Sequence, residues 1–309
     1  MAELAEDFDD FAQPESAQAA QPTTENDTPE PASKESQHDA ISSAASSTTT
    51  IKPDAKRNAF TEMMRPKPKP SISHQPHQSM AHKASQVIRG VWRGALVEYI
   101  DHPERFPAQV IRATPYTVLI KDAFPKATIH LLLLPRSPAH YLLHPHTAFA
   151  DPAFLAMMRE EAAEAAKLAA AELARQLGSF SATSRARSEA MDRGVSYDQL
   201  PPGRDYSKDI RVGIHAHPSM AHLHVHVISR DMRSERLKHK KHYNSFNTPF
   251  FVPLADYPLA EDDVRRETGY QNANLSKGLV CWRCGREFGS QFKALKSHLE
   301  EEFEAWRAE

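Results

Sequence analysis

The most informative segment of the chain is His222-Leu223-His224-Val225-His226-Val227-Ile228, in which three histidines alternate with apolar residues. Successive side chains of a β-strand point to opposite faces. The segment therefore predicts a strand within residues 221–229 whose Leu223, Val225 and Val227 face a core. The three imidazoles are expected to share the other surface.

Three interpretations of the histidines compete. A solvent-facing strand would accept Ser, Thr or Lys equally well, so it does not account for the repeated histidine. A metal site usually draws its ligands from several elements, whereas same-face positions of one strand diverge. Nucleophilic catalysis at phosphorus fits best, because imidazole has a pKa of about 6.5 and is largely neutral near pH 7. Upstream, His215 and Ser219 flank a proline-bent connection that brings them toward the same phosphate.

Strands and helices can be predicted on both sides of this segment. A helix is expected from Trp92 to Ile100, where His102-Pro103 stops it. The strongest helix follows Asp151 as N-cap and ends at Gly178. Residues 179–208 are polar and predict a long exposed loop. Further strands are expected at residues 109–114, 117–122, 128–135 and 210–216 because these segments are rich in Val, Ile and Leu.

The chain divides into three predicted parts. Residues 1–85 are rich in Pro, Ser, Thr, Ala and Gln and are expected to be disordered, with one island at Arg57–Pro70 as a candidate protein-binding motif. Residues 86–250 predict an α+β domain, and residues 251–309 predict a linker followed by a small appended module. No internal repeat was found.

The charge is distributed unevenly. The net charge is −2, but residues 1–50 hold 11 acidic residues and one basic residue, a net of −10, so that residues 51–309 carry +8. A basic body suggests a polyanionic partner, and the acidic tail could bind a protein or screen the body. A membrane span and a secretory signal are not expected, since no long apolar run or basic N-terminal region occurs.

The two cysteines form a Cys281-x-x-Cys284 pair that precedes His298-x-x-x-Glu302 on a predicted helix. This spacing predicts a ββα zinc finger, in which the carboxylate replaces a second histidine. In the alternative, Glu302 is only a charged residue of the helix surface. A redox dithiol is less consistent, since no thioredoxin-like pattern surrounds the pair. A closed four-ligand site would be structural, and nearby basic residues suit phosphate contacts.

Taken together, three segments resemble the aprataxin branch of the histidine triad (HIT) superfamily. They are HAHPSMAHLHVHVIS (215–229), KHKKHYNSF (238–246) and LIKDAFPKATIHLLLLPR (119–136). The Cys-Cys-His-Glu pattern is similar to the finger of fungal members. The resemblance implies a HIT-fold antiparallel sheet with flanking helices, and a hydrolase that removes 5′-AMP from DNA ends through a covalent histidine–AMP intermediate.

The resemblance also implies roles for individual residues. His224 would be the nucleophile, with His222, His226 and His215 around the phosphates. Trp92 would stack on a DNA end, unless it only belongs to the core. Substrate contacts would come from Asp122, Lys126, His130, Ser219, Met220, Lys238 and Lys241, although Asp122 could instead form a turn and Lys126 could be a solvated lysine. Zn²⁺ would be bound by Cys281, Cys284, His298 and Glu302, and catalysis would need no metal.

Two other functions stay open from the sequence. One is a general HIT hydrolase acting on small dinucleotides, and the other is a non-catalytic zinc-finger protein that binds DNA. The expected partners of the favoured enzyme are nicked or adenylated DNA and the product AMP. Guanylate caps are a second possible substrate. A nuclear location is expected, with a cytoplasmic pool left open.

Overall fold

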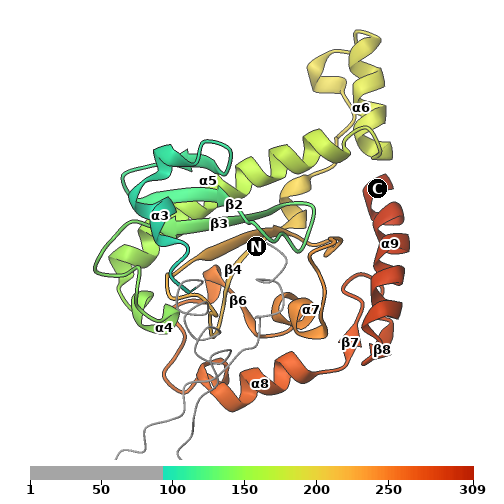
Figure 1. Ribbon diagram of the computed structural model, residues 1–309. Coiled ribbons are helices and arrows are strands. Elements are labelled where there is room, and N and C mark those ends of the chain that lie inside the picture. Colours follow the sequence, from blue (N-terminus) through green and yellow to red (C-terminus); the bar gives the residue numbers. More distant parts are fainter. Residues whose placement is uncertain (1–92) are drawn as a thin grey trace, which may run out of the picture. The chain divides into compact units, whose positions relative to one another are not determined.

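Six antiparallel strands form the central sheet, in the spatial order β1-β2-β3-β5-β4-β6 (Figure 1). The chain alternates short Val-, Ile- and Leu-rich segments with turns, and each such segment forms a strand. The antiparallel sheet predicted from the sequence is therefore confirmed. The strands are β1 Val110–Ala113, β2 Thr117–Lys121, β3 His130–Pro135, β4 Ile210–His215, β5 Val225–Ser229 and β6 Phe251–Pro253.

This computed structural model describes residues 93–309, which all belong to one compact unit. The predictions for residues 1–85, including the Arg57–Pro70 island, lie outside the described residues, and so does Trp92. Among the helices of residues 93–309, none is both long and apolar enough to cross a membrane.

Helix α5 (Pro152–Leu177) covers one face of the sheet. It begins as predicted, because the Asp151 carboxylate accepts hydrogen bonds from the backbone N–H groups of Ala153 and Phe154. Its small buried residues allow close approach to the strands. The main core cluster lies between them and includes Leu119, Leu131, Leu133, Leu223, Val225, Val227, Met158, Ala165 and Leu173.

Two smaller apolar clusters cover the opposite face. One, under α3 (Val97–Asp101), contains Leu132 and Leu134 of β3. The other, under α7 (Lys240–Asn247), contains Ile228 of β5. Since side chains alternate along a strand, His130, His226 and His215 project from this same face, in the region between the two clusters.

The start of β5 differs from the prediction. The strand begins at Val225, and residues 221–224 form bends and irregular backbone instead of continuing it. In that segment the N–H of Ala221 bonds to the carbonyl of Arg93, and that of Leu223 bonds to Tyr141, so its hydrogen bonds leave the sheet. Leu223 still packs in the main core, as predicted. The three histidines are buried, not displayed on an open surface.

Two other expectations were wrong. Residues 182–192 form helix α6 within the predicted loop, because Ser181 caps it and the segment is rich in Ala, Arg, Glu and Met. Only Ala190 of this helix is buried, so its sequence lacks the apolar periodicity by which a helix is predicted. The helix expected from Trp92 to Ile100 is interrupted, because residues 94–96 form turns, but α3 covers Val97–Ile100 and ends before His102-Pro103 as expected. The remaining α-helices before the finger are α4 Pro145–Ala148 and α8 Thr268–Ser276.

The C-terminal module has the predicted ββα order, with β7 (Leu279–Val280), β8 (Glu287–Gly289) and α9 (Phe292–Ala308). Residues 251–253, assigned from the sequence to this module, instead form β6 and pair with β4. The apolar stripe of α9 reaches beyond the finger, because Phe303 and Trp306 pack in the main core.

Trp306 also ties the end of α9 to the start of β4. Its Nε1 donates to Asp209 Oδ1 at 3.1 Å, and Arg204 binds Asp209 while its guanidinium lies over the indole ring. Asp209 directly precedes β4 in the chain. Helix α9 therefore shares its packing with the six-stranded sheet.

Replacing Trp306 by Ala is expected to lower the free energy of unfolding of the whole unit by about 3–5 kcal/mol, as for other buried aromatic truncations. Urea unfolding followed by circular dichroism measures this. Tyr197→Ala, at a position that is 83% exposed, is the matched control and should change little. Equal effects of the two substitutions would contradict the shared core.

Candidate active site and zinc finger

Four buried histidines gather on the sheet face opposite α5. His130 Nε2 and His226 Nδ1 are 3.0 Å apart. The ring of His226 lies 4.5 Å from that of His215 and 4.9 Å from that of His224, between ring centroids. These side chains come from β3, β4, β5 and the residue before β5. The fold thus assembles in one place histidines that are separated by up to 96 positions in sequence.

Hydrogen bonds determine the tautomers of His130 and His226. The backbone N–H of Lys126 donates to His130 Nδ1 at 3.1 Å, so a neutral His130 carries its proton on Nε2. That proton is donated to His226 Nδ1. His226 must then carry its own proton on Nε2, which is buried and makes no hydrogen bond within residues 93–309. This N–H is therefore available to donate to a phosphate oxygen.

His224 has the opposite tautomer to His130 and His226, with its proton on Nδ1. Its Nδ1 lies 2.7 Å from the backbone carbonyl oxygen of His222. A carbonyl can only accept, so Nδ1 carries the proton and Nε2 carries the lone pair. The group that orients His224 is thus the main chain of His222. The imidazole of His222 instead packs against the Tyr141 ring, 5.4 Å away.

Burial keeps these imidazoles neutral. Desolvation lowers the pKa of His130 to about 4, although the nearby Asp122 carboxylate opposes the shift. Desolvation also lowers the pKa of His224, and it lowers that of His226 well below its usual value, with help from neighbouring histidines. Near pH 7 the imidazole of His224 is therefore neutral, with a free lone pair on Nε2.

Asp122 and Lys126 border the histidines. Asp122 Oδ2 is 3.4 Å from His130 Nε2, while Oδ1 accepts from the N–H of Phe124 and stabilises the turn. The carboxylate therefore has the turn-forming role and also lies next to the site. The ammonium of Lys126 donates to the carbonyl of Phe124, so its predicted phosphate contact stays a prediction.

The donor atoms of Asp122, His130 and His226 lie within 4.8 Å of one another. The two imidazoles in this group already share a hydrogen bond, which accounts for their close approach without an ion. The protons of the two imidazoles are ordered by the hydrogen bonds from the Lys126 N–H through His130 to His226.

The other predicted substrate residues lie around the site at different depths. Ser219 is exposed in the bend after β4, and Met220 packs against the cluster under α3. Lys238 precedes α7 and its N–H bonds to His242, while Lys241 lies in the first turn of α7. Their contacts with substrate stay predictions.

Sequence reasoning missed Phe246 as part of the site. Its ring packs against His130, His215 and His226, with centroid distances of 4.7–5.3 Å. Phe246 comes from α7, within the segment 238–246. That segment indicated the family but gave no local signal that this ring would cover the histidines. The ring excludes water from the histidines and contributes to their lowered pKa values.

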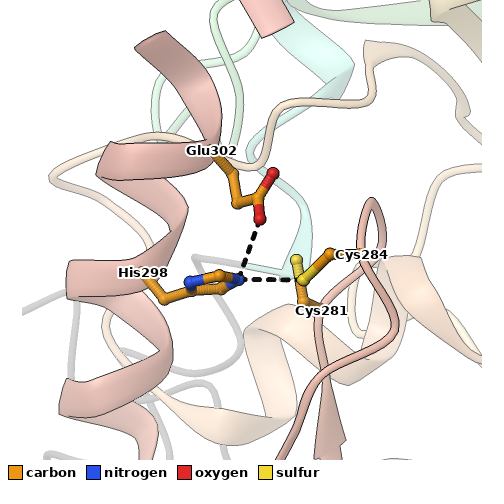
Figure 2. A group of neighbouring side chains, drawn as sticks. All are labelled: Cys281, Cys284, His298 and Glu302. Carbon is orange, nitrogen blue, oxygen red and sulfur yellow. Dashed lines mark hydrogen bonds and ion pairs between the residues drawn. The ribbon is translucent and has the colours of Figure 1, made fainter. Parts of the chain in front are cut away.

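Figure 2 shows the four predicted finger ligands converging from the turn that follows β7 and from α9. Cys284 Sγ lies 3.1 Å from His298 Nε2, which is 3.2 Å from Glu302 Oε1. The cysteine turn is closed by a bond from the N–H of Gly285 to the carbonyl of Cys281, and Gly285 has a φ of 77°. That left-handed conformation favours glycine at this position.

These residues fit a zinc ion. All four donor atoms lie within 4.8 Å of one another, and both thiols are reduced. Zinc–ligand bonds of about 2.0–2.3 Å in a tetrahedron place donor atoms roughly 3.5 Å apart. Arg283, one of the basic residues near the finger, pairs with Glu302 and Glu309. Its charge lowers the pKa of Glu302 and keeps that carboxylate ionised.

Comparisons with known proteins agree with this geometry. The HIT domain family model matches residues 104–233, and the model of the C2HE / C2H2 / C2HC zinc-binding finger matches residues 247–305. The sheet, the histidines and the Cys-Cys-His-Glu group thus define a HIT-domain protein with a C-terminal zinc-binding finger.

Similar proteins narrow this class further. The aprataxin-like protein of Saccharomyces cerevisiae is 37% identical over 69% of this chain and 96% of its own. That of Schizosaccharomyces pombe is 34% identical over 70% and 83%. The crystal structure of the aprataxin ortholog Hnt3 in complex with DNA has a TM-score of 0.56 and 31% identity, and covers 70% of this chain and 96% of its own.

The chain therefore belongs to the aprataxin-like family of the HIT superfamily, as its motifs predicted. It is a DNA-repair hydrolase of the aprataxin type.

Replacing Glu302 by Gln is expected to lower zinc affinity by about ten- to a hundredfold or more, since a neutral amide is a poor zinc ligand. Competition with a chromogenic chelator measures the affinity. Glu304→Gln is the matched control on the same helix, where Glu304 pairs with Arg307. Unchanged affinity in Glu302→Gln would mean that Glu302 is only a surface charge.

The lowered pKa of His130 predicts acid sensitivity. An unfolded chain takes up a proton near pH 6.5, whereas folded His130 does so at about 4, so stability is full above pH 6.5 and falls between these values. The loss from this residue approaches about 3 kcal/mol at pH 4. Urea unfolding across this range measures it. His130→Gln should flatten the slope, whereas His102→Gln, at a half-exposed position, should not.

Proposed function

We propose that this enzyme removes AMP joined to the 5′-phosphate of DNA through a covalent adduct on His224. The observation that carries the proposal is the Nδ1 hydrogen bond from His224 to the His222 carbonyl, which leaves the Nε2 lone pair for attack. The family and the DNA complex of Hnt3 support DNA as the substrate of this chain.

In the first step, His224 Nε2 attacks the α-phosphorus of the adenylate. The new P–N bond replaces the bond from phosphorus to the bridging oxygen, which leaves with the DNA 5′-phosphate. Positive charge then develops on the imidazole, and the His222 carbonyl stabilises it through the Nδ1–H bond. In the second step water attacks the same phosphorus, the P–N bond breaks, and AMP is released with neutral His224 restored.

His226 stabilises the charge that develops on the phosphate. Its Nε2–H is held as a donor by the chain of hydrogen bonds from Lys126 through His130. A donor that is fixed in advance in a buried site stabilises a developing oxyanion without reorganising. Asp122 and Lys126 would contact the substrate, as the resemblance implies, and Lys126 would add positive charge.

The finger would hold one structural zinc ion through Cys281, Cys284, His298 and Glu302. Four protein ligands leave no open position, so the ion organises the finger and takes no part in hydrolysis. Catalysis by the histidines requires no metal in this scheme. Lys277, Lys293 and Lys296 would contact DNA phosphates, and Trp92 would stack at the DNA end.

Guanylate-capped DNA ends are a second candidate substrate, since the attacked phosphate is chemically the same. The solved complex of Hnt3 with DNA and guanosine supports this. A nuclear location follows from a substrate on DNA and is part of the proposal, as is a protein partner for the Arg57–Pro70 island.

The proposal is tested by incubating the enzyme with 5′-adenylated nicked DNA, guanylated nicked DNA and a diadenosine polyphosphate, and measuring nucleotide release. Release from adenylated DNA should be strongly preferred over the dinucleotide. His224→Ala should reduce it by about a thousandfold or more, because the nucleophile is lost. His102→Ala serves as the matched control and should retain activity.

The same assay separates the competing functions. Release from the dinucleotide alone would identify a general HIT hydrolase. DNA binding without release from any substrate would identify a non-catalytic zinc-finger protein. A phosphoramidate adduct found on His224 by mass spectrometry after acid-free quenching would support the covalent step directly.

A further inference from the structure

A second group of histidines lies beside the active site and has no role in the proposed reaction. His144 and His146 flank Pro145 at the start of α4, and His217 follows β4. The ring centroids are 4.6 Å apart for His144–His146, 5.6 Å for His144–His217 and 6.4 Å for His146–His217. We call these three residues the α4 histidine cluster.

Two nitrogens of this cluster are buried without a partner. The His146 side chain is 8% exposed, and its Nδ1 is hydrogen bonded to the Tyr257 hydroxyl at 3.1 Å. On the other side of the ring, Nε2 makes no hydrogen bond within residues 93–309, and the same holds for His217 Nε2. Buried polar atoms in native proteins usually have partners. This pair therefore points to a ligand that comes from outside the chain.

The charges around the cluster favour an anion. Burial lowers the pKa of His144 and His146, the neighbouring histidines add to this, and the positive charge of Arg266 lowers both pKa values further. The Asp263 carboxylate acts in the opposite direction and raises the pKa of His146. Its charge is neutralised, because Arg265 binds both of its oxygens. A metal ion would be repelled by Arg266. It would also find His144 Nδ1 occupied, because that atom accepts from the N–H of His146.

The cluster adjoins the candidate active site along the chain. The ring of His215 contacts that of His226 in the active site. His217 lies two residues after His215 in the chain, so the Cα atoms of His215 and His217 are at most about 7 Å apart. Ser219, the predicted phosphate contact, follows two residues later. Consecutive phosphates of one DNA strand are separated by about 3.4 Å along the helix axis. A strand that places its 5′ end at His224 would therefore pass within reach of His217.

We propose that His146 Nε2, His217 Nε2 and the Arg266 guanidinium bind a backbone phosphate of the DNA strand adjacent to the reacting 5′ end. The subsite rests on the proposed action on DNA and explains how the enzyme distinguishes a DNA strand from a small dinucleotide. Phosphate contacts position a strand without reading its sequence.

The test uses His217→Val and Arg266→Gln in the full-length, zinc-loaded chain. Binding to 5′-phosphorylated nicked DNA, the product form, is measured by fluorescence anisotropy at several salt concentrations. Each variant should bind about tenfold more weakly, and Arg266→Gln should reduce the slope of log K against log salt by about one. Arg185→Gln removes the same charge from the exposed face of α6 and is the matched control.

Hydrolysis of a diadenosine polyphosphate provides the second readout. Both variants should hydrolyse it as fast as the parent enzyme, because it has no neighbouring strand phosphate. An equal loss on DNA and dinucleotide would mean a general structural role and would overturn the subsite. So would unchanged DNA affinity in both variants, or a second zinc ion that His217→Val abolishes in a zinc titration.

The binding measurement keeps this proposal separate from the proposed reaction. A parent enzyme that binds nicked DNA but releases no AMP would refute the deadenylase function alone. Loss of affinity in His217→Val would still support the phosphate subsite in that case. If Arg266→Gln proved unstable on thermal melting, His217→Val would carry the test, since His217 is only half-buried.

Discussion

The hydrogen bond between His130 and His226 depends on the register of β3 against β5. Leu132 lies opposite His226 and His130 opposite Ile228, so the two imidazoles are diagonal neighbours on one face. A slip of one residue would turn one of these side chains into the core under α5. The same register places Leu131 and Leu133 against Val227 and Val225 in that core. Packing on one face of the sheet thus fixes the chemistry on the other.

Burial on both faces of the sheet gives the histidines their chemical state. Phe246 and the two smaller apolar clusters exclude water from the site, which lowers the imidazole pKa values. Gly213, opposite His226, allows the Phe251 ring to pack closely over this face, because a Cβ at position 213 would lie 2.6 Å from that ring. Neutral histidines can then be ordered by hydrogen bonds alone, one as a lone-pair carrier and another as a donor. On a solvent-exposed face, water would compete for these hydrogen bonds, and the two histidines would not keep distinct tautomers.

The finger packs against the same sheet that carries the histidines. Its helix α9 supplies Trp306 to the main core and a bond to Asp209, immediately before β4. The strand that begins there ends at His215 in the active site. The candidate zinc site therefore lies in a module that packs directly against the sheet domain.

The sequence by itself predicted five of the six strands of the sheet, helix α5, the candidate finger ligands and the family. These features depend on local signals: alternation of apolar residues, the Asp151 cap, and the spacing of Cys281, Cys284, His298 and Glu302. The resemblance also singled out His224 as the candidate nucleophile. Helix α6 escaped prediction because only Ala190 of it is buried, so a cap and good helix formers had no apolar pattern beside them.

Only the tertiary structure decided how the histidines are used. The sequence showed three imidazoles alternating with apolar residues, but His222 and His224 lie in irregular backbone before β5, and main-chain oxygen orients the nucleophile. The pairing of His130 with His226, the cover by Phe246 and the meeting of His146 with His217 join residues far apart in the chain. Such contacts follow from strand register and packing, because no local preference encodes which distant side chains will share a face.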